Sequence, residues 1–397
     1  MPGKPKILIV GAGIGGLTAA LALLRRGIEV EVFERAPELT EVGAGLHVSP
    51  NGTRVLFELG LKDRIESTGV TPKARYVALW NTGQHWLLAG HDAGAAERYG
   101  SPYLLMHRGD LHAALTDAVR ERGGMVHTSS SFVGFQQDEN RVDLQLANGD
   151  RVQGDALIGA DGIHSTVRRV LFGPDRPQFT GYLAWRGLIP MDLAPDGMRS
   201  VATNWISHLG SITLYPVRRG ELLNFIGNTP RSDWQTESWI ERGTVTECAA
   251  DFVGWHRDIQ QVIQQIEVPY KWGVFTREPI PQWTVGRVTL LGDACHSMRP
   301  TLGQGANMAL EDGLVLARCI ESYCDDLGTA LRKYEDARHE RTTKVVQASG
   351  GQSRRRHNES LADPVAAARY IETEWAPDRV QERYDWIYEY DAHSASI

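Results

Sequence analysis

The amino-acid sequence predicts an α/β protein with more than one sheet, and three observations support this fold class. Residues 7–33 have the pattern of a strand, a glycine-containing turn, a helix and a second strand. Residues 178–227 contain apolar runs and alternating patterns typical of strands, and the residues after 305 carry apolar positions at helical spacing. A chain of 397 residues is long enough for one composite domain or for two to three separate ones.

Composition and charge indicate which binding partners and which cellular compartment to expect for this protein. The net charge of -7 does not indicate a nucleic-acid or membrane-surface protein. The basic run "RRRH" at 354–357 is expected to be a solvated helix face. The 4 cysteines form no CxxC pair, which fits a reducing cytoplasm. Residues 7–24 carry no charge, but their glycines and the charged "RRGIEVEVFE" that follows favour a buried strand and helix over a membrane span.

The first segment carries a dinucleotide-binding motif. The stretch "KILIVGAGIGGLTAALALLRRGIEVEVFER" contains Gly11, Gly13 and Gly16 as G-x-G-x-x-G between an apolar strand and an Ala- and Leu-rich helix. Gly11 allows the tight turn, Gly13 lets the backbone approach a pyrophosphate, and Gly16 lets helix and strand pack closely. The N–H groups of the helix start would then face the phosphates.

Glu34 ends the second strand of this unit. An acidic side chain there accepts hydrogen bonds from a ribose hydroxyl and repels a 2′-phosphate, so the site suits an unphosphorylated adenosine. The motif predicts a Rossmann-like dinucleotide site, and by itself it does not choose between FAD and NAD.

Two further segments have both a functional and an ordinary interpretation. "MHRGDLHAAL" places Arg108 and Asp110 at the start of a helical pattern, where Asp110 could simply cap a surface turn. "ALIGADGIHSTVRR" places Asp161 and Gly162 between an apolar strand and a basic helix, where they could form an ordinary strand-to-helix turn.

The stretch "GDACHSMRPTLGQGAN" at 292–307 is open to three interpretations. Asp293, Cys295 and His296 could hold a metal, or Cys295 could be a nucleophile with His296 as its base. Neighbouring side chains usually diverge, and both kinds of site need further partners in defined geometry. We therefore expect no metal here and expect the loop to cradle a cofactor, with Cys295 and His296 in supporting roles.

Together, these motifs and their order resemble the single-component FAD-dependent aromatic hydroxylases, the family with the para-hydroxybenzoate hydroxylase fold. The resemblance covers nearly the whole chain and is strongest to the salicylate, 3-hydroxybenzoate and 6-hydroxynicotinate hydroxylase branch, whose chains end in an aromatic tail similar to "YDWIYEYDA". It implies FAD as cofactor and NADH or NADPH as co-substrate, without a second Rossmann unit. The helix after residue 305 would direct its positive end at the flavin. The implied cofactor-binding residues are Gly11, Gly13, Ile14, Gly16, Glu34, Arg35, Arg108, Asp161, Gly162, Asp293, Pro300, Gly303, Gly305, Ala306 and Asn307.

The resemblance also implies a set of substrate-side residues. His47, Tyr215 and Pro300 match catalytic or pocket positions, and His47, Tyr215, Ser211 and Thr301 match positions near the substrate. Two positions depart from the branch. Ser211 stands where relatives often carry a histidine base, and Thr301 stands where some carry a histidine or glutamine. The identity of the base is therefore left open by the sequence.

The activity implied by the resemblance is hydroxylation of an aromatic hydroxycarboxylic acid, such as salicylate, 3-hydroxybenzoate or 6-hydroxynicotinate. NAD(P)H would reduce FAD, and O2 would then form a flavin C4a-hydroperoxide that attacks the ring. The alternatives are a flavin epoxidase or urate-type monooxygenase on the same fold, or a flavin dehydrogenase that inserts no oxygen. The implied partners are small molecules only, in a cytoplasmic monomer or homodimer.

The expected organisation places a discontinuous Rossmann-like FAD-binding part at 1–175 and 276–345. An inserted β-sheet substrate part is expected at 176–275. A C-terminal helical segment is expected at 346–397.

Overall fold

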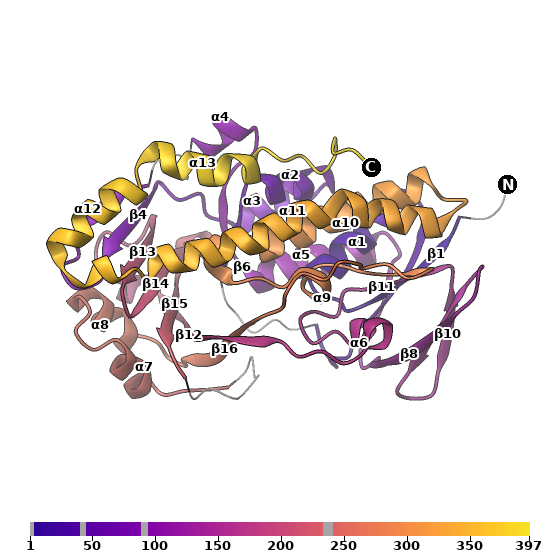
Figure 1. Cartoon of the computed structure of the whole chain (residues 1–397), viewed down its shortest axis with the longest axis horizontal. Helices are drawn as coiled ribbons and strands as arrows, with labels where there is room; N and C mark the ends of the chain where they lie inside the picture. The colour runs from indigo at the N-terminus through magenta and orange to yellow at the C-terminus, as the bar shows by residue number, and fades with distance from the viewer. Residues whose placement is uncertain (1–3, 40–44, 89–93, 233–240) are drawn as a thin grey trace.

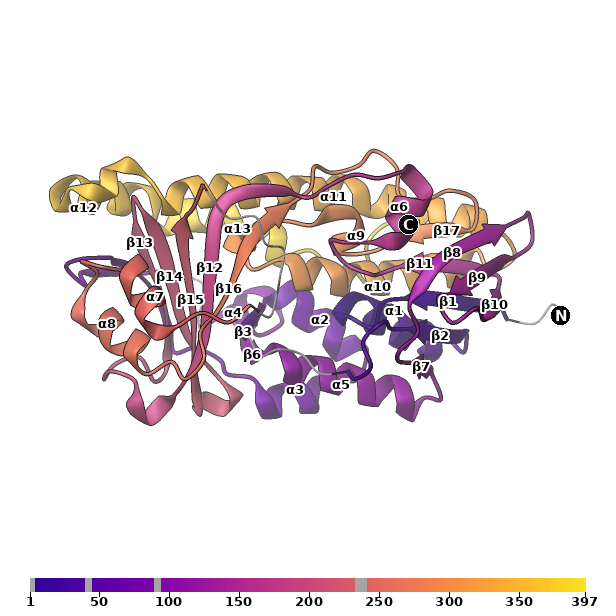
Figure 2. The same ribbon diagram turned by 90° about the horizontal axis from the view of Figure 1, so that it is seen from below.

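The computed structural model describes residues 4–39, 45–88, 94–232 and 241–397, and it places two large sheets toward opposite ends of an elongated molecule (Figure 1 and Figure 2). Near the N-terminus lies a sheet whose five strands, as far as the chain is described, are all parallel. Its order is β17 (Val288–Leu290), β11 (Ala156–Gly159), β1 (Lys6–Val10), β2 (Glu29–Phe33) and β7 (Met125–His127).

The first βαβ unit has the arrangement that the sequence predicts. β1 leads through the glycine turn into α1 (Ile14–Arg25), and β2 then pairs in parallel with β1. α1 packs against α10 (Gly305–Ser322), where a Cβ added to Gly313 would lie 2.7 Å from the backbone nitrogen of Ala19. This close contact brings the starts of α1 and α10 to the same side of the parallel sheet, which is where a shared ligand could reach both.

The second large sheet is the one predicted from residues 178–227. Its order is β16 (Tyr270–Thr276), β12 (Gln178–Pro190), β15 (Leu222–Pro230), β14 (Gly210–Val217), β13 (Val201–Ser207), β4 (Ala74–Leu79) and β5 (His85–Leu87). β4 pairs in parallel with β13, so this sheet also includes strands that precede residue 100. It therefore extends beyond the 176–275 segment expected for it, because pairing between distant strands leaves no mark in the local pattern.

Two smaller sheets and a set of helices complete the described part of the chain before residue 327. One antiparallel sheet contains β10 (Arg151–Gly154), β9 (Val142–Leu146) and β8 (Phe132–Gln137), and a two-stranded sheet pairs β3 (Gly45–Val48) with β6 (Leu104–His107). The other helices before residue 327 are α2 (Pro50–Glu58), α3 (Lys62–Thr68), α4 (Ala95–Tyr99), α5 (Arg108–Glu121), α6 (Thr166–Phe172), α7 (Val245–Asp251), α8 (Arg257–Gln264) and α9 (Asp293–His296). Short 3-10 turns are η1 (Met191–Leu193), η2 (Arg218–Gly220), η3 (Pro300–Leu302) and η4 (Glu359–Ala362).

The C-terminal segment is mostly helical. The long helix α11 (Leu327–Arg356) runs from the parallel-sheet end to the seven-stranded sheet, and α12 (Pro364–Glu374) and α13 (Pro377–Tyr388) then turn back along it (Figure 1). Arg341 Nη2 of α11 donates to the carbonyl of Ile387 at 2.9 Å, and Arg54 Nη1 of α2 donates to the carbonyl of Tyr390 at 2.6 Å. These contacts fix the end of the C-terminal segment onto α11 and α2.

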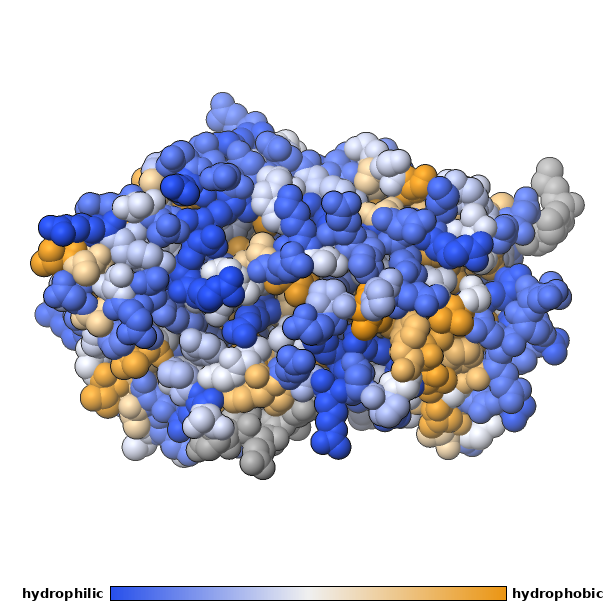
Figure 3. All heavy atoms as spheres, in the orientation of Figure 1, coloured by the Kyte–Doolittle hydropathy of each residue, from blue (hydrophilic) through white to orange (hydrophobic). Residues whose placement is uncertain are grey.

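The surface shown in Figure 3 is mostly hydrophilic, with scattered apolar patches. Across the described part of the chain, none of the helices combines the length and apolar character that crossing a membrane requires.

Candidate active site

Two adjoining cavities lie between the parallel sheet and the seven-stranded sheet. The first, of about 600 Å³, runs along the glycine turn and the end of β2. The second, of about 320 Å³, lies between the start of α10 and the face of the seven-stranded sheet. Gly13, Arg108, Gly162 and Asp293 line both. A long ligand held in the first cavity can therefore reach the second.

The glycine turn is shaped for a phosphate-bearing ligand. Gly11 has φ 103°, and a Cβ there would lie 2.4 Å from the Ala160 carbonyl oxygen. Gly13 lines the cavity and has open space where a Cβ would be. No side chain caps the start of α1, so its first N–H groups remain available to a ligand. Gly16 does not line the cavity; it packs against the Gly11 carbonyl and holds the turn to the helix.

Glu34 is held in place at the wall of the first cavity, beside Arg35. Its Oε2 accepts from the backbone N–H of Ala12 and its Oε1 accepts from that of Ala36, both at 2.9 Å. Each carboxylate oxygen retains a second lone pair, which a ribose hydroxyl can use. The turn, the uncapped helix start and this acid together fit the ADP portion of a dinucleotide.

The segments 161–162 and 107–110 each contribute to the walls of the cavities and hold the start of a helix. The Asp161 carboxylate accepts from the N–H groups of Thr166 at 2.6 Å and Val167 at 3.1 Å, so it holds the start of α6 while lining the first cavity. Gly162 has φ 75° and open space beside it. Arg108 lines both cavities, and the cap of α5 is His107, not Asp110, because His107 Nδ1 accepts from the Gly109 N–H.

The loop after β17 presents one side chain to the cavities. Asp293 lines both, and enclosure by the protein raises the pKa of its carboxyl. Cys295 and His296 are buried behind it: the Cys295 thiol contacts the Gly292 carbonyl, and His296 Nε2 lies 2.6 Å from Asp312 Oδ2. Burial opposes protonation of His296, but Asp312 holds its pKa well above the ordinary value. Within the described residues, no group of three or more His, Cys, Asp or Glu side chains could hold a metal ion.

The start of α10 faces the second cavity without a side-chain cap. Gly303, at φ 67°, turns the chain, and Gly303, Gly305 and Ala306 line the cavity. Asn307 is buried instead, and its Nδ2 donates to the His47 carbonyl at 2.9 Å and to the Gly303 carbonyl at 2.8 Å. Free N–H groups beside Asp293 fit the polar edge and the hydroxyl-bearing chain of a flavin, and Asn307 positions this loop against His47.

His47 and Tyr215 meet in the wall of the second cavity. The ring centroids are 4.4 Å apart, and His47 Nδ1 lies 2.7 Å from the Tyr103 hydroxyl. Burial, together with Arg75 and Arg356, holds the pKa of His47 well below its ordinary value, so its ring is neutral. Burial also raises the pKa of Tyr215, so its hydroxyl keeps its proton.

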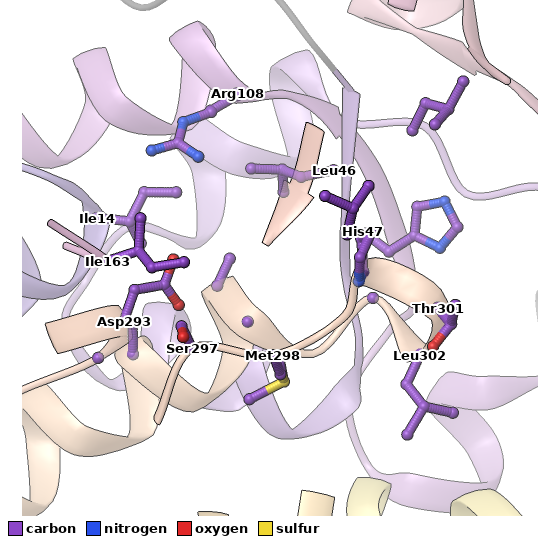
Figure 4. A pocket seen from close by; sticks show the side chains of 18 of the residues that line it. Ile14, Leu46, His47, Arg108, Ile163, Asp293, Ser297, Met298, Thr301 and Leu302 are labelled. Carbon is purple, nitrogen blue, oxygen red and sulfur yellow. The ribbon is translucent and has the colours of Figure 1, made fainter. Parts of the chain in front are cut away.

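Pro300 and Thr301 form another part of the cavity wall. Figure 4 shows Thr301 and Leu302 on the same side as His47, with Arg108 and Asp293 across the cavity from them. Thr301 Oγ1 donates to the Ser349 carbonyl at 2.6 Å, which ties η3 to α11.

Ser211 is the one substrate-side residue that does not line the cavity. Its Oγ lies 3.1 Å from His357 Nε2, and the His357 ring stacks on Tyr182 with centroids 4.6 Å apart. Burial, Arg356 and Arg299 lower the pKa of His357 to about 3. A neutral histidine that follows the end of α11 thus contacts Ser211, the position at which the family resemblance led us to look for a base.

Several cavity residues were not found from the sequence. Arg75, Arg186, Arg356 and Tyr384 all line the second cavity. The expectation of a solvated face at "RRRH" is wrong for Arg356, which is buried, and correct for Arg354, which is exposed. The sequence shows where the charged residues lie along the chain but not which of them are buried. Arg356 is buried because the end of α11 packs against the C-terminal helices.

Comparison with known proteins agrees with this geometry. The family described as "FAD binding domain" matches residues 4–349. The chain is 35% identical over 390 residues to 3-amino-4-hydroxybenzoate 2-monooxygenase PtnB3 of Streptomyces platensis, covering 98% of this chain and 97% of that one. It is 36% identical over 369 residues to 6-hydroxynicotinate 3-monooxygenase of Pseudomonas fluorescens, covering 90% and 94%. The structure of Klebsiella pneumoniae HpxO with FAD and uric acid superposes with a TM-score of 0.83 at 27% identity, covering 96% of this chain and 97% of that one.

Proposed function

This chain belongs to the single-component FAD-dependent aromatic monooxygenases, and from that premise we propose that it hydroxylates an aromatic hydroxycarboxylic acid with NAD(P)H and O2. The curated relatives named above act on an aminohydroxybenzoate and a hydroxynicotinate. We assign this chain a substrate of the same kind, an aromatic ring that carries a carboxylate and an electron-donating group.

The observation that supports this proposal is the junction of the two cavities. The groove at the glycine turn shares wall residues with a cavity that contains His47, Tyr215 and Pro300. FAD bound in the groove would supply hydride acceptance from NAD(P)H and activation of O2. An aromatic ring in the second cavity would then lie next to the flavin end of the groove.

The chain's own residues would position the substrate ring, limit water in the second cavity and accept a proton from the substrate. Leu46, Ile226, Trp272 and Phe275 give the second cavity apolar walls that limit water. The neutral His47 imidazole, held by the Tyr103 hydroxyl, can exchange a proton with a ring hydroxyl of the substrate. Removing that proton raises the electron density of the ring, which favours attack by an electrophilic oxygen.

The test is NADH and NADPH oxidation by the purified protein with a panel of hydroxybenzoates and hydroxypyridine carboxylates under 18O-labelled O2. We expect a flavin-containing protein, stimulation by at least one acid, and one labelled oxygen in a ring hydroxyl of the product. Label in an epoxide, or in an oxidised purine tested alongside, would support the related epoxidase or urate-type activities instead. Turnover that leaves no label in the product would identify a dehydrogenase.

A further inference from the structure

Four arginines line the second cavity among the described residues, and two of them, Arg75 and Arg356, are buried and come from different parts of the chain. Arg75 lies on β4 and Arg356 is the last residue of α11. Both line the cavity that contains His47, and their exposed fractions are only 5% and 8%. Both charges act on the His47 imidazole, and each acts on the other. Both guanidinium groups therefore lie near His47 in the wall of this cavity, Arg75 over the ring of Tyr103, whose hydroxyl contacts His47 Nδ1.

Neither arginine has an acidic partner among the residues that the structure describes. Five arginines are buried within the described residues, and three of them are paired: Arg168 and Arg277 with Asp175, and Arg338 with Asp312 and Glu311. Arg75 and Arg356 form no ion pair in this part of the chain, and the Nε of each is buried without a hydrogen-bond partner.

The surroundings of the two arginines are aromatic, not anionic. The Arg75 guanidinium lies over the Tyr103 ring, 4.7 Å from its centroid, and the Tyr384 and Tyr388 side chains are also close. Asp293 is the one carboxylate among the described wall residues, and it is held across the cavity from His47 (Figure 4). Enclosing two like charges without a counter-charge is costly, and an anionic ligand removes that cost.

We propose that Arg75 and Arg356 together bind the carboxylate of the aromatic substrate. This inference rests on the proposed function and adds the orientation of the substrate to it. The guanidinium forks offer parallel N–H donors to one carboxylate, which is the geometry that arginine recognises best. The ring would then extend from this pair past His47 and Tyr215 toward Pro300, so the carboxylate points away from the cofactor groove.

The proposal assigns part of the substrate selection to the C-terminal segment. Arg356 and Tyr384 both lie beyond residue 349, where the match to the FAD-binding family ends. The segment is held in place by the contacts of Arg341 and Arg54 to the main chain near its end. Anion recognition would thus combine Arg75, from within the FAD-binding family match, with Arg356, from beyond it.

The experiment is isothermal titration calorimetry of the FAD-loaded protein without pyridine nucleotide. The probes are benzoate, 3-hydroxybenzoate and 6-hydroxynicotinate, each compared with its neutral carboxamide. We expect at least one acid to bind wild type at least about 10-fold more tightly than its amide. R75Q and R356Q should each weaken binding of that acid by about 10- to 100-fold and leave amide binding nearly unchanged. R354Q, which removes an exposed charge two residues from Arg356, is the matched control and should bind like wild type.

Several results would overturn the proposal. They are equal binding of acids and amides to wild type, unchanged acid binding in both glutamine variants, or displacement of the acid by an equal concentration of sulfate. If a glutamine variant fails to retain FAD, R75K and R356K decide the matter, because lysine keeps the charge but loses the fork and should give an intermediate loss.

The two proposals can fail separately. Arginine-dependent acid binding without stimulated oxidation of NADH or NADPH would refute the proposed function alone. Stimulated oxidation with acid binding that ignores both arginines would refute the anion site alone.

Discussion

The imidazole of His47 meets the ring of Tyr215 edge-on, with centroids 4.4 Å apart and ring planes at 81°. Gly45, two residues before His47, makes this approach possible, because a Cβ there would lie 2.5 Å from Tyr215 Cε2. The Gly45 N–H donates to Asn224 Oδ1 at 2.7 Å, which holds β3 against the seven-stranded sheet. The pair therefore joins the two halves of the molecule at the proposed reaction site.

Tyr215→Phe should separate substrate recognition from cofactor binding. The change removes one hydroxyl and keeps the ring that packs against His47. We expect acid-stimulated NADH oxidation to fall about 10-fold, as for a lost hydrogen bond, with unchanged flavin content. Steady-state kinetics and the ratio of released flavin to protein measure the two effects. Tyr370→Phe is the control, since its hydroxyl donates to the Arg355 carbonyl outside the cavity. Equal losses of flavin and stimulation would exclude a pocket role for Tyr215.

Gly11→Ala should abolish flavin retention. A Cβ at Gly11 would lie 2.4 Å from a backbone oxygen at φ 103°, so the turn beneath the helix start would have to shift. The control is Gly149→Ala, which has φ 93° but open space around its Cβ. Both variants bear the backbone strain, and only the first meets a steric clash. We expect the flavin-to-protein ratio to drop for Gly11→Ala alone; a similar drop in both would attribute it to strain.

Arg338→Met should destabilise the protein strongly. Arg338 is buried, its Nε donates to Asp312 Oδ1 at 2.7 Å, and it also pairs with Glu311. Removing it leaves two buried carboxylates short of a counter-charge, which costs about 3–5 kcal/mol. Urea unfolding monitored by tryptophan fluorescence measures the change. Arg332→Met, at an exposed position on the same helix, should alter stability by less than about 1 kcal/mol. A loss as small as the control's would mean that the network contributes little.

His357→Gln should weaken the acid dependence of stability. The folded-state pKa of His357 is lowered from 6.5 to about 3, so between these values the unfolded chain binds a proton that the folded chain does not. Stability from this group is complete above pH 6.5 and falls as the pH falls. By pH 5 the loss is about 2 kcal/mol, which the variant should not show. Unfolding measured at pH 7 and pH 5 tests this, with exposed His85→Gln as control. Parallel losses in wild type and His357→Gln would contradict the prediction.

The local patterns of the chain predicted much of the fold. The apolar run at 7–10, the three glycines and the acid at Glu34 lie within one βαβ unit, and short-range contacts fix their relative positions. The strands of 178–227 also have an apolar pattern that can be recognised in the sequence without knowing which strands pair with them. The addition of β4 and β5 to that sheet was not predicted, because β4 pairs with a strand more than a hundred residues later.

The candidate site divides in the same way. Gly11, Glu34 and Asp293 could be chosen from sequence because each belongs to a motif of fixed spacing, and His47 and Tyr215 because they match positions in related chains. Arg75 and Arg356 could not, since an arginine in a strand or in the run "RRRH" has no local sign of burial. Asn307 remains a prediction for the cofactor site through its backbone N–H at the start of α10, while its carboxamide donates to the His47 and Gly303 carbonyls.

The sequence by itself determined the nucleotide-binding unit, the sheet in the middle of the chain and the family resemblance, because turns, periodicity and motif spacing act over a few residues. The tertiary structure alone decided which charges are buried and what they face. α11 and the C-terminal helices carry Arg356 onto the cavity that β4 lines with Arg75. Whether a guanidinium is solvated or enclosed without a partner depends on surfaces that meet only after the whole chain has folded.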